Sequence, residues 1–203
     1  MKAYDPFKRL IDVVVGGAAC LASLPLQCVI ALLVRRKLGA PVLFRQQRPG
    51  KDGRIFELIK FRTMLDVDEA EGFLTDEQRM TRFGALLRST SLDELPSLWN
   101  VVKGDMSLVG PRPLLVRYLD RYTPVQARRH EVRPGVTGLA QVSGRNALSW
   151  NDKFAKDVEY VDNRSLLLDV RILLLTVARV LKREGISADG EVTMTEFMGN
   201  HRA

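Results

Sequence analysis

The chain has 203 residues, enough for one domain with a hydrophobic core but too few for two ordinary domains together with a membrane anchor. Lys and Arg outnumber Asp and Glu by 31 to 24, and the formal charge of +7 favours partners that carry phosphate: nucleic acids, anionic lipids or nucleotides. The two cysteines, Cys20 and Cys28, both lie in an apolar segment, which excludes a disulfide framework and a CxxC metal site.

The first predicted element is an apolar segment from Leu10 to Val34, in which Asp12 is the one charged residue. A segment of this length can cross a bilayer, which needs about 20 residues. Basic residues stand on both sides of it, so the rule that positive charge marks the cytoplasmic flank gives no preferred orientation for a spanning helix. We expect Asp12 to pair with Lys8 or Arg9, one helical turn away.

A proline in the middle of this segment, Pro25, predicts a bend. Pro25 removes one backbone donor and crowds the carbonyl of Leu21, so it kinks or breaks a helix. The arm at 10–24 would reach about 22 Å, short of a hydrocarbon core of roughly 30 Å. We therefore expect a bent, retained helix that enters and leaves one leaflet, hinged at Ser23 and Pro25, with the Ser23 hydroxyl bonded back to a carbonyl. A kinked spanning helix is the alternative reading.

Beyond this anchor, at 1–38, the mixed composition of 39–203 predicts one globular domain without repeats. The pattern predicts a strand at 55–64, with Lys60 and Arg62 on one face, and a helix at 76–88. A further helix should open near Asp93 and stop at Gly104. The remaining expected elements are an extended or turned segment at 111–113, a short helix at 123–130, a loop-rich or short-strand region at 133–146 and an amphipathic helix at 166–183.

The helix at 166–183 has two readings. Its apolar stripe consists of Leu166, Val170, Leu173, Leu174, Val177 and Leu181. Asp169, Thr176, Arg179 and Arg183 should face away from that stripe. The stripe could pack into the core of the domain, or it could lie on a membrane surface with the basic residues in water.

Asp93 and Glu94 are adjacent carboxylates at a predicted helix start. Ser91 and Glu94 have the spacing of a capping box, which would make the pair purely structural. Pro96 favours a start at Asp93 instead, because a start at Ser91 would place the proline where a hydrogen bond is lost. In the functional reading, the helix start favours an ionised carboxylate that attacks phosphorus, and the two carboxylates could hold Mg²⁺.

Several basic residues lie in segments rich in glycine, proline or strand signal and could gather around a phosphate. They are Lys60, Arg62, Arg88, Arg112, Arg133 and Arg145. Arg112, between two prolines, should be the most restrained. His130 and His201 stand alone, and the sequence carries no zinc or Ser-His-Asp pattern.

Motifs along nearly the whole chain, from about residue 7 to residue 197, resemble one family, the bacterial small monotopic phosphoglycosyltransferases, or initiating sugar transferases. Besides the anchor residues Lys8, Arg9, Asp12 and Pro25, the matching stretches are 47–50 (QRPG), 60–64 (KFRTM), 91–96 (SLDELP), 103–113 (KGDMSLVGPRP), 133–138 (RPGVTG), 144–146 (GRN) and Asp157 with Val158 before Tyr160. Their length and order make a chance match a poor explanation.

The resemblance implies an α+β, mainly helical fold in which a re-entrant N-terminal membrane helix-hairpin carries a small globular domain with amphipathic interfacial helices. The protein would be monotopic in the bacterial inner membrane, with its catalytic domain, at 39–203, on the cytoplasmic face. The family bends its anchor at a Ser-Pro pair. Here Leu24 separates Ser23 from Pro25, so the local hydrogen bonding of the bend should differ.

By the same resemblance, Asp93 would attack the sugar-bearing phosphorus of a UDP-sugar, release UMP and hold the phosphosugar until undecaprenyl phosphate accepts it. Glu94 would bind Mg²⁺ with Asp93 or handle a proton. Phosphates and other parts of the substrates would be bound by a further set of residues: Lys60, Arg62, Arg88, Arg112, Arg145 and Asp157. A homodimer is left open by these motifs.

The sugar and the class of function leave alternatives. Segments 144–150 and 195–197 resemble the enzymes of N-linked glycosylation that use UDP-N,N′-diacetylbacillosamine. UDP-glucose, UDP-galactose or another UDP-N-acetyl sugar, used for capsule, exopolysaccharide or O-antigen, is the alternative substrate. A non-enzymatic scaffold that docks on anionic membrane is the competing class. Nucleic-acid binding is disfavoured, because no helix-turn-helix or zinc pattern accompanies the basic residues.

Overall fold

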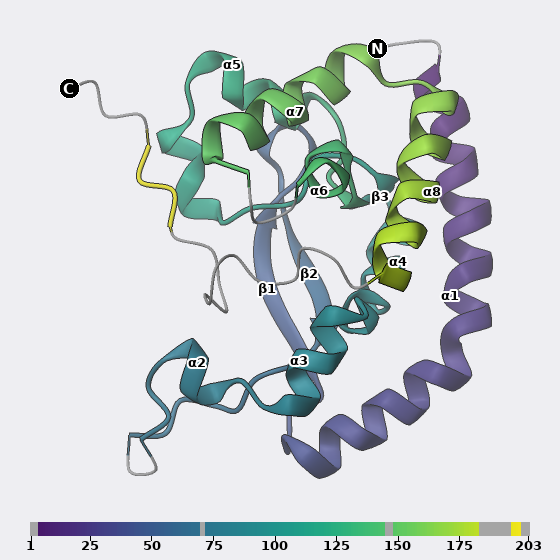
Figure 1. The fold of residues 1–203 in the computed structure, drawn as a ribbon. Helices are drawn as coiled ribbons and strands as arrows, with labels where there is room; N and C mark the ends of the chain where they lie inside the picture. Colours follow the sequence, from purple (N-terminus) through teal and green to yellow (C-terminus); the bar gives the residue numbers. More distant parts are fainter. Residues whose placement is uncertain (1–3, 70–71, 145–147, 183–195, 200–203) are drawn as a thin grey trace.

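A computed structural model describes residues 4–69, 72–144, 148–182 and 196–199, and it is mainly helical with two small sheets, as the sequence predicts (Figure 1). β1 (Leu43–Pro49) and β2 (Ile55–Phe61) form an antiparallel hairpin, and β3 (Ser107–Val109) pairs in parallel with β4 (Gly135–Thr137). The α-helices are α1 (Tyr4–Lys37), α2 (Asp76–Arg79), α3 (Arg82–Ser89), α4 (Ser97–Lys103), α5 (Pro124–Ala127), α6 (Leu139–Ser143), α7 (Trp150–Asn163) and α8 (Leu166–Lys182). Short 3₁₀ helices are η1 (Lys51–Gly53), η2 (Leu92–Glu94), η3 (Val116–Arg121) and η4 (Arg128–Glu131).

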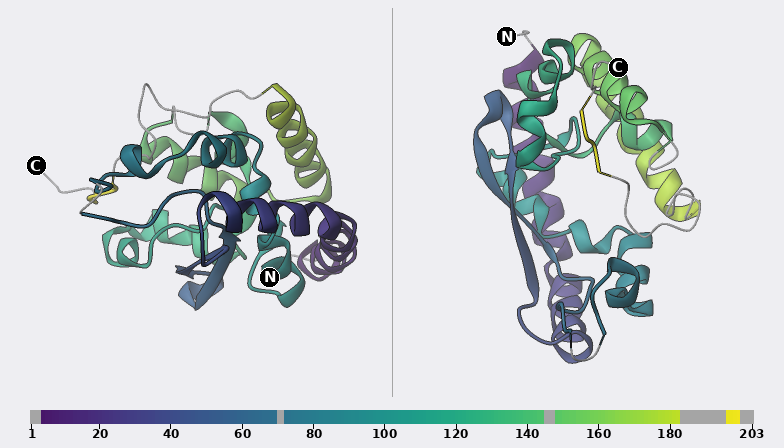
Figure 2. Two further views of the ribbon diagram at one scale, coloured as in Figure 1. Left: turned by 90° about the horizontal axis from the view of Figure 1, so that it is seen from below. Right: turned by 90° about the vertical axis from the view of Figure 1, so that its left-hand side faces the viewer.

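Helix α1 is long and apolar enough to cross a membrane, judged by its length and composition. It contains Pro25, and its two arms point in clearly different directions (Figures 1 and 2). The Ser23 hydroxyl donates to the carbonyl of Cys20 at 3.1 Å, as predicted, and also accepts from the Gln27 amide at 2.9 Å. A proline inside a helix is a known cause of such a bend, because it removes a donor and clashes with the preceding turn.

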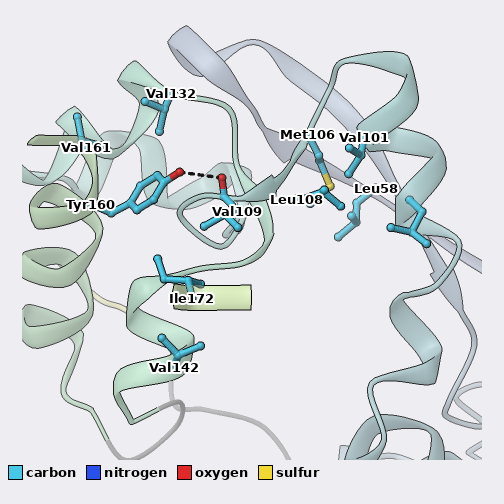
Figure 3. Packing of buried hydrophobic residues seen from close by; sticks show 11 residues of the cluster. Leu58, Val101, Met106, Leu108, Val109, Val132, Val142, Tyr160, Val161 and Ile172 are labelled. Carbon is cyan, nitrogen blue, oxygen red and sulfur yellow. Dashed lines mark hydrogen bonds between the residues drawn. The ribbon is translucent and has the colours of Figure 1, made fainter. Parts of the chain in front are cut away.

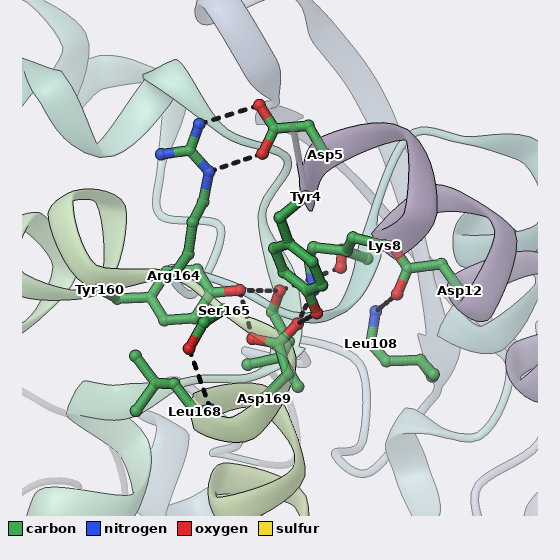
Figure 4. Close-up of polar contacts among 12 residues, drawn as sticks. Tyr4, Asp5, Lys8, Asp12, Leu108, Tyr160, Arg164, Ser165, Leu168 and Asp169 are labelled. Atoms are coloured by element: carbon green, nitrogen blue, oxygen red, sulfur yellow. Dashed lines mark hydrogen bonds and ion pairs between the residues drawn. The ribbon is translucent and has the colours of Figure 1, made fainter. Parts of the chain in front are cut away.

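Polar contacts fix the first arm of α1 to the domain (Figure 4). The Lys8 Nζ lies 2.5 Å from a carboxylate oxygen of Asp169 on α8. Arg9 donates to the last carbonyls of α4, those of Val101 and Val102. Asp12 is buried and accepts from the backbone N–H of Leu108 at 3.0 Å. The prediction that Asp12 pairs with Lys8 or Arg9 is therefore wrong, because each of the three side chains has a tertiary partner.

The main hydrophobic core lies between α4, β3, α6, α7 and α8 (Figure 3). Its most deeply buried members include Val101, Met106, Val109, Tyr160 and Ile172. The Tyr160 hydroxyl lies 2.8 Å from a carboxylate oxygen of Asp169 and 3.1 Å from the carbonyl of Val109, so its single hydrogen has an acceptor at the polar end of a buried aromatic ring. The core therefore ties α7 and α8 to the strand that precedes the segment at 111–113.

A second hydrophobic cluster joins the second arm of α1 to the hairpin and to the segment around η2. Its buried members are Ile30, Val34, Leu38, Phe61 and Leu87. Leu92 and Leu95 pack against it from either side of the Asp93 and Glu94 pair. The apolar anchor thus supports the segment that carries both carboxylates.

Several predicted elements need correction. The helix expected at 76–88 is two helices, because Met80 is extended and Thr81 caps α3 by accepting from the N–H of Gly84. The strand expected at 55–64 ends at Phe61. The short helix expected at 123–130 is α5 followed by η4, and the region at 133–146 contains β4 as well as helix α6. Gly104 ends α4 with a φ of 97°, as predicted.

Most of the apolar stripe predicted for α8 does not pack into the core of the domain. Leu166, Val170, Leu174 and Val177 of the predicted stripe are exposed, although Leu173 is partly buried. Asp169 faces the interior instead, and the Thr176 hydroxyl lies 2.7 Å from that of Thr137. Buried hydrogen-bond partners therefore decide which side of this helix faces the core.

Candidate functional site

Glu94 lies at the centre of a cluster of charged residues from three segments. Lys60, near the end of β2, places its Nζ 2.5 Å from Oε1 of Glu94. Arg112, in the extended segment after β3, places a guanidinium nitrogen 2.9 Å from the same oxygen. The side chains of Lys60 and Glu94 are mostly buried, whereas Arg112 is 46% exposed. The cluster thus opens to solvent on the Arg112 side.

Asp93 lies next to this cluster but, unlike Glu94, forms no ion pair with its cations among the described residues. Its exposed fraction is 9%, and no hydrogen bond or ion pair to its carboxylate is found within the described parts of the chain. Asp93 is thus a largely buried residue whose carboxylate is not held by any neighbouring cation that the structure describes, and a group of this kind in a charged cluster is a candidate for chemistry.

The backbone around the two carboxylates differs from the predicted helix start. Ser91 adopts a left-handed conformation with a φ of 55° and makes no capping bond with its side chain, so the capping-box reading is wrong. Asp93 and Glu94 lie in the 3₁₀ turn η2, and α4 begins after Pro96. The helix is therefore shorter than predicted, and Asp93 precedes its first turn.

The charges give the two neighbours opposite pKa shifts. Burial and the adjacent Glu94 raise the pKa of Asp93 to about 6, against the opposing effect of Lys60, Arg112 and Arg88. Burial alone would also raise the pKa of Glu94, but Arg112 and Lys60 outweigh it and lower that pKa to about 2. Near neutral pH, Glu94 is a fixed anion, whereas Asp93 is close to its titration range.

Arg88, at the end of α3, completes the surroundings of Asp93. Its Nε donates to the Thr63 hydroxyl at 3.0 Å. Burial lowers the pKa of Arg88, and the charge of Asp93 opposes that shift, which indicates that the two groups lie close enough to interact. The structure therefore brings together Lys60, Arg88, Asp93, Glu94 and Arg112 from among the predicted site residues.

Other predicted site residues lie elsewhere. Arg62 follows β2, where its guanidinium donates to the carbonyls of Leu38 and Ala40 and pairs with Asp66. It thus fastens the end of α1 to the hairpin. Asp157 is buried on α7 and pairs with Arg129 at 2.8 Å. Arg145 lies outside the described residues, and the substrate-binding roles of these residues stay predictions.

Two basic residues near Arg112 were not singled out from the sequence. Burial and the charge of Arg112 lower the pKa of Arg48 to about 10, and its Nε is buried without a partner in the described structure. Arg48 belongs to the stretch at 47–50 that carries the family resemblance, which was a signal for it. Arg129 donates to the carbonyl of Arg112 at 2.7 Å. Nothing in its spacing distinguishes it from the neighbouring Arg128.

The residues at this site are compatible with Mg²⁺. Among the described residues, no group of three or more His, Cys, Asp or Glu side chains could hold a metal. Mg²⁺ usually keeps several waters, however, and needs only one or two carboxylates together with substrate phosphates. The unpaired carboxylate of Asp93 fits that requirement, and Glu94 would have to share its charge with Lys60 and Arg112.

The chain is similar to known sugar transferases. A family model described as bacterial sugar transferase matches residues 3–183. The chain is 54% identical over 195 residues to the uncharacterized sugar transferase EpsL of Bacillus subtilis (strain 168), which covers 95% of this chain and 96% of the relative. It is 40% identical over 193 residues to the UDP-glucose:undecaprenyl-phosphate glucose-1-phosphate transferase of Caulobacter vibrioides, with 88% of this chain and 71% of the relative covered. It is also 42% identical over 196 residues to the UDP-galactose-lipid carrier transferase of Erwinia amylovora, with 88% of this chain but only 41% of the longer relative covered.

Proposed function

The chain belongs to the bacterial sugar transferase family, and we propose that it moves a sugar 1-phosphate from a UDP-sugar to undecaprenyl phosphate. The observation that carries this proposal is the contrast between the two neighbouring carboxylates. Glu94 is held by two cations, whereas Asp93 is buried, unpaired among the described residues and raised in pKa. Such a group is suited to covalent catalysis.

In the proposed reaction, a carboxylate oxygen of Asp93 attacks the phosphorus that bears the sugar. The bond from this phosphorus to the bridging oxygen breaks, and UMP leaves with the electron pair. A phosphate oxygen of undecaprenyl phosphate then attacks the same phosphorus, breaks the acyl-phosphate bond and restores the Asp93 carboxylate. The product is an undecaprenyl-diphosphate sugar.

The surrounding cations would serve the transfer by neutralising charge that spreads over the phosphoryl oxygens. Phosphoryl transfer depends mainly on positioning and electrostatic stabilisation. Arg112 is exposed enough to contact a substrate, and Arg88 lies on the Asp93 side of the cluster. Mg²⁺, held by Asp93 with a contribution from Glu94, would supply further neutralisation of the diphosphate when bound.

We also propose that α1 is re-entrant and that the catalytic domain lies on the cytoplasmic face of the inner membrane. The bend at Pro25 and the exposed apolar residues of both arms support a helix that stays in one leaflet. The exposed apolar side of α8, next to α1, would lie at the same interface. Because Leu92 and Leu95 pack on the cluster that Ile30 and Val34 of α1 help to form, Asp93 would be held near the lipid phosphates.

The sugar is proposed only as a class. Two of the relatives reported above are named for glucose and galactose substrates, which favours these sugars. UDP-N,N′-diacetylbacillosamine remains a candidate from the sequence motifs alone, and part of its motif at 144–150 lies outside the described residues.

The experiment is an assay of UMP release by the purified protein in vesicles that contain undecaprenyl phosphate. The panel comprises UDP-glucose, UDP-galactose, UDP-N-acetylglucosamine and UDP-N,N′-diacetylbacillosamine. We expect release with at least one sugar, dependent on the lipid phosphate, and a loss of at least about a thousandfold in D93N. Membrane binding without UMP release from any donor would favour the scaffold function instead.

A further inference from the structure

The extended segment that carries Arg112 has few backbone anchors. Pro111 and Pro113 have no N–H to donate, so this segment must be held through its carbonyls. The carbonyl of Pro111 accepts from the N–H of Gly135 at 3.0 Å. The carbonyl of Arg112 accepts from a guanidinium nitrogen of Arg129 at 2.7 Å. Arg129 therefore contacts the backbone of the residue whose own side chain reaches Glu94.

Arg129 is in turn fixed by its surroundings. Its side chain is 2% exposed, and two of its nitrogens donate to one oxygen of Asp157 at 3.0 and 2.8 Å. Its guanidinium also lies 5.7 Å from the ring centres of Tyr122 and Phe154. Asp157 is only 5% exposed, so both members of this pair are buried.

The geometry points to Arg129 and Asp157 as positioning residues that direct the guanidinium of Arg112 toward Glu94 and the substrate phosphate. Nη2 of Arg129 donates both to Asp157 on α7 and to the carbonyl of Arg112, and Nε adds a second bond to Asp157 that fixes the plane of the guanidinium. A buried ion pair is a weak source of stability, since the cost of removing both charges from water offsets their attraction. The pair acts instead by fixing the backbone of Arg112, and this role rests on the proposed function.

The structure provides a matched control. Arg128 and Asp162 form a second ion pair between η4 and α7, adjacent in sequence to Arg129 but exposed to solvent. Arg128 has no contact with Arg112 among the described interactions. Changes at Arg128 therefore test for a general effect of weakening the junction of η4 and α7.

The central variant is Arg129→Lys, which keeps the charge but ends about one bond short of the Nη2 position and lacks the second nitrogen, so it cannot keep all three hydrogen bonds. We expect kcat for UMP release to fall at least tenfold with a smaller change in KM, while Arg128→Lys stays within twofold of the wild type. In an Arg112→Ala background, Arg129→Lys should have less than a twofold further effect. Equal losses in both backgrounds, or no loss in either, would overturn the positioning role.

A second readout does not depend on activity. The side-chain Nε–H signal of Arg112 in ¹⁵N NMR, assigned by its loss in Arg112→Ala, should shift in Arg129→Lys but not in Arg128→Lys. An unchanged signal would count against the inference even if the wild type released no UMP and the proposed function itself failed. If Arg129→Lys does not fold, Asp157→Asn replaces it: the Arg112 signal should shift in Asp157→Asn but not in Arg128→Lys. If neither variant folds while Arg128→Lys does, the pair is structural and the inference is wrong.

Discussion

Asp12, within the apolar helix α1, accepts a hydrogen bond at 3.0 Å from the backbone N–H of Leu108 in β3. This strand leads directly into the segment that carries Arg112. Helix α1 and the site are thus joined by a buried polar contact as well as by apolar packing. The position of the site relative to the anchor is therefore a property of the fold.

Asp12→Ala should destabilise the protein by about 1–3 kcal/mol, because it leaves the buried N–H of Leu108 without an acceptor. Asp12→Asn should cost less, since its amide oxygen can still accept that bond. Unfolding by denaturant in detergent micelles measures both effects. Val14→Ala, at an exposed position of the same helix, is the control, and equal costs for Asp12→Ala and Val14→Ala would contradict the assigned contact.

Glu94→Gln should lower the pKa of Asp93 below about 6. The negative charge of Glu94 raises the pKa of Asp93, and the substitution removes that charge. Lys60 and Arg112 lower the pKa of Asp93, and without Glu94 their positive charges are no longer offset by an ion pair. The Asp93 carboxylate would then ionise at lower pH than in the wild type. Carboxyl ¹³C NMR of the metal-free protein follows this titration directly. Glu57→Gln, at an exposed ion pair of the hairpin, should leave it unchanged, and a rise in the Asp93 pKa would show that the charge balance is misassigned.

Pro25→Ala should straighten α1 and allow it to span the membrane, because the substitution restores a backbone donor and removes the clash with the preceding turn. The measurement is labelling, from each side of sealed vesicles, of a cysteine placed near residue 4 in a background without Cys20 and Cys28. Leu24→Ala is the neighbouring control. If the labelled side is the same in wild type and Pro25→Ala, the proline is not what keeps the helix in one leaflet.

The exposed apolar side of α8 should contact lipid. A spin label at Leu174→Cys is expected to be more accessible to oxygen, which partitions into the bilayer, than to a polar nickel reagent. A label at Ala155→Cys, on an exposed position of α7, should show the reverse preference. Matching accessibilities at the two positions would place α8 in water.

The sequence predicted the features that depend on local chemistry. The stop at Gly104 and the hydroxyl bond of Ser23 follow from what the glycine backbone and the serine side chain allow. The inward face of α8 could not be read from its hydrophobic stripe, because Asp169 is buried by partners more than 150 positions away on α1. Likewise, the convergence of Lys60, Glu94 and Arg112 requires contacts between three separate segments. The role of Arg129 could not be predicted from the sequence, because only the fold brings it together with Arg112 and Asp157.

The central claim is that Asp93 carries the phosphosugar, and covalent trapping tests it most directly. The protein is incubated with a UDP-sugar labelled on the sugar, without lipid acceptor, then quenched and digested for mass spectrometry. We predict a sugar-phosphate adduct on the peptide that contains Asp93, released by undecaprenyl phosphate and absent from D93N. An adduct on a different residue, or normal UMP release by D93N, would contradict the account.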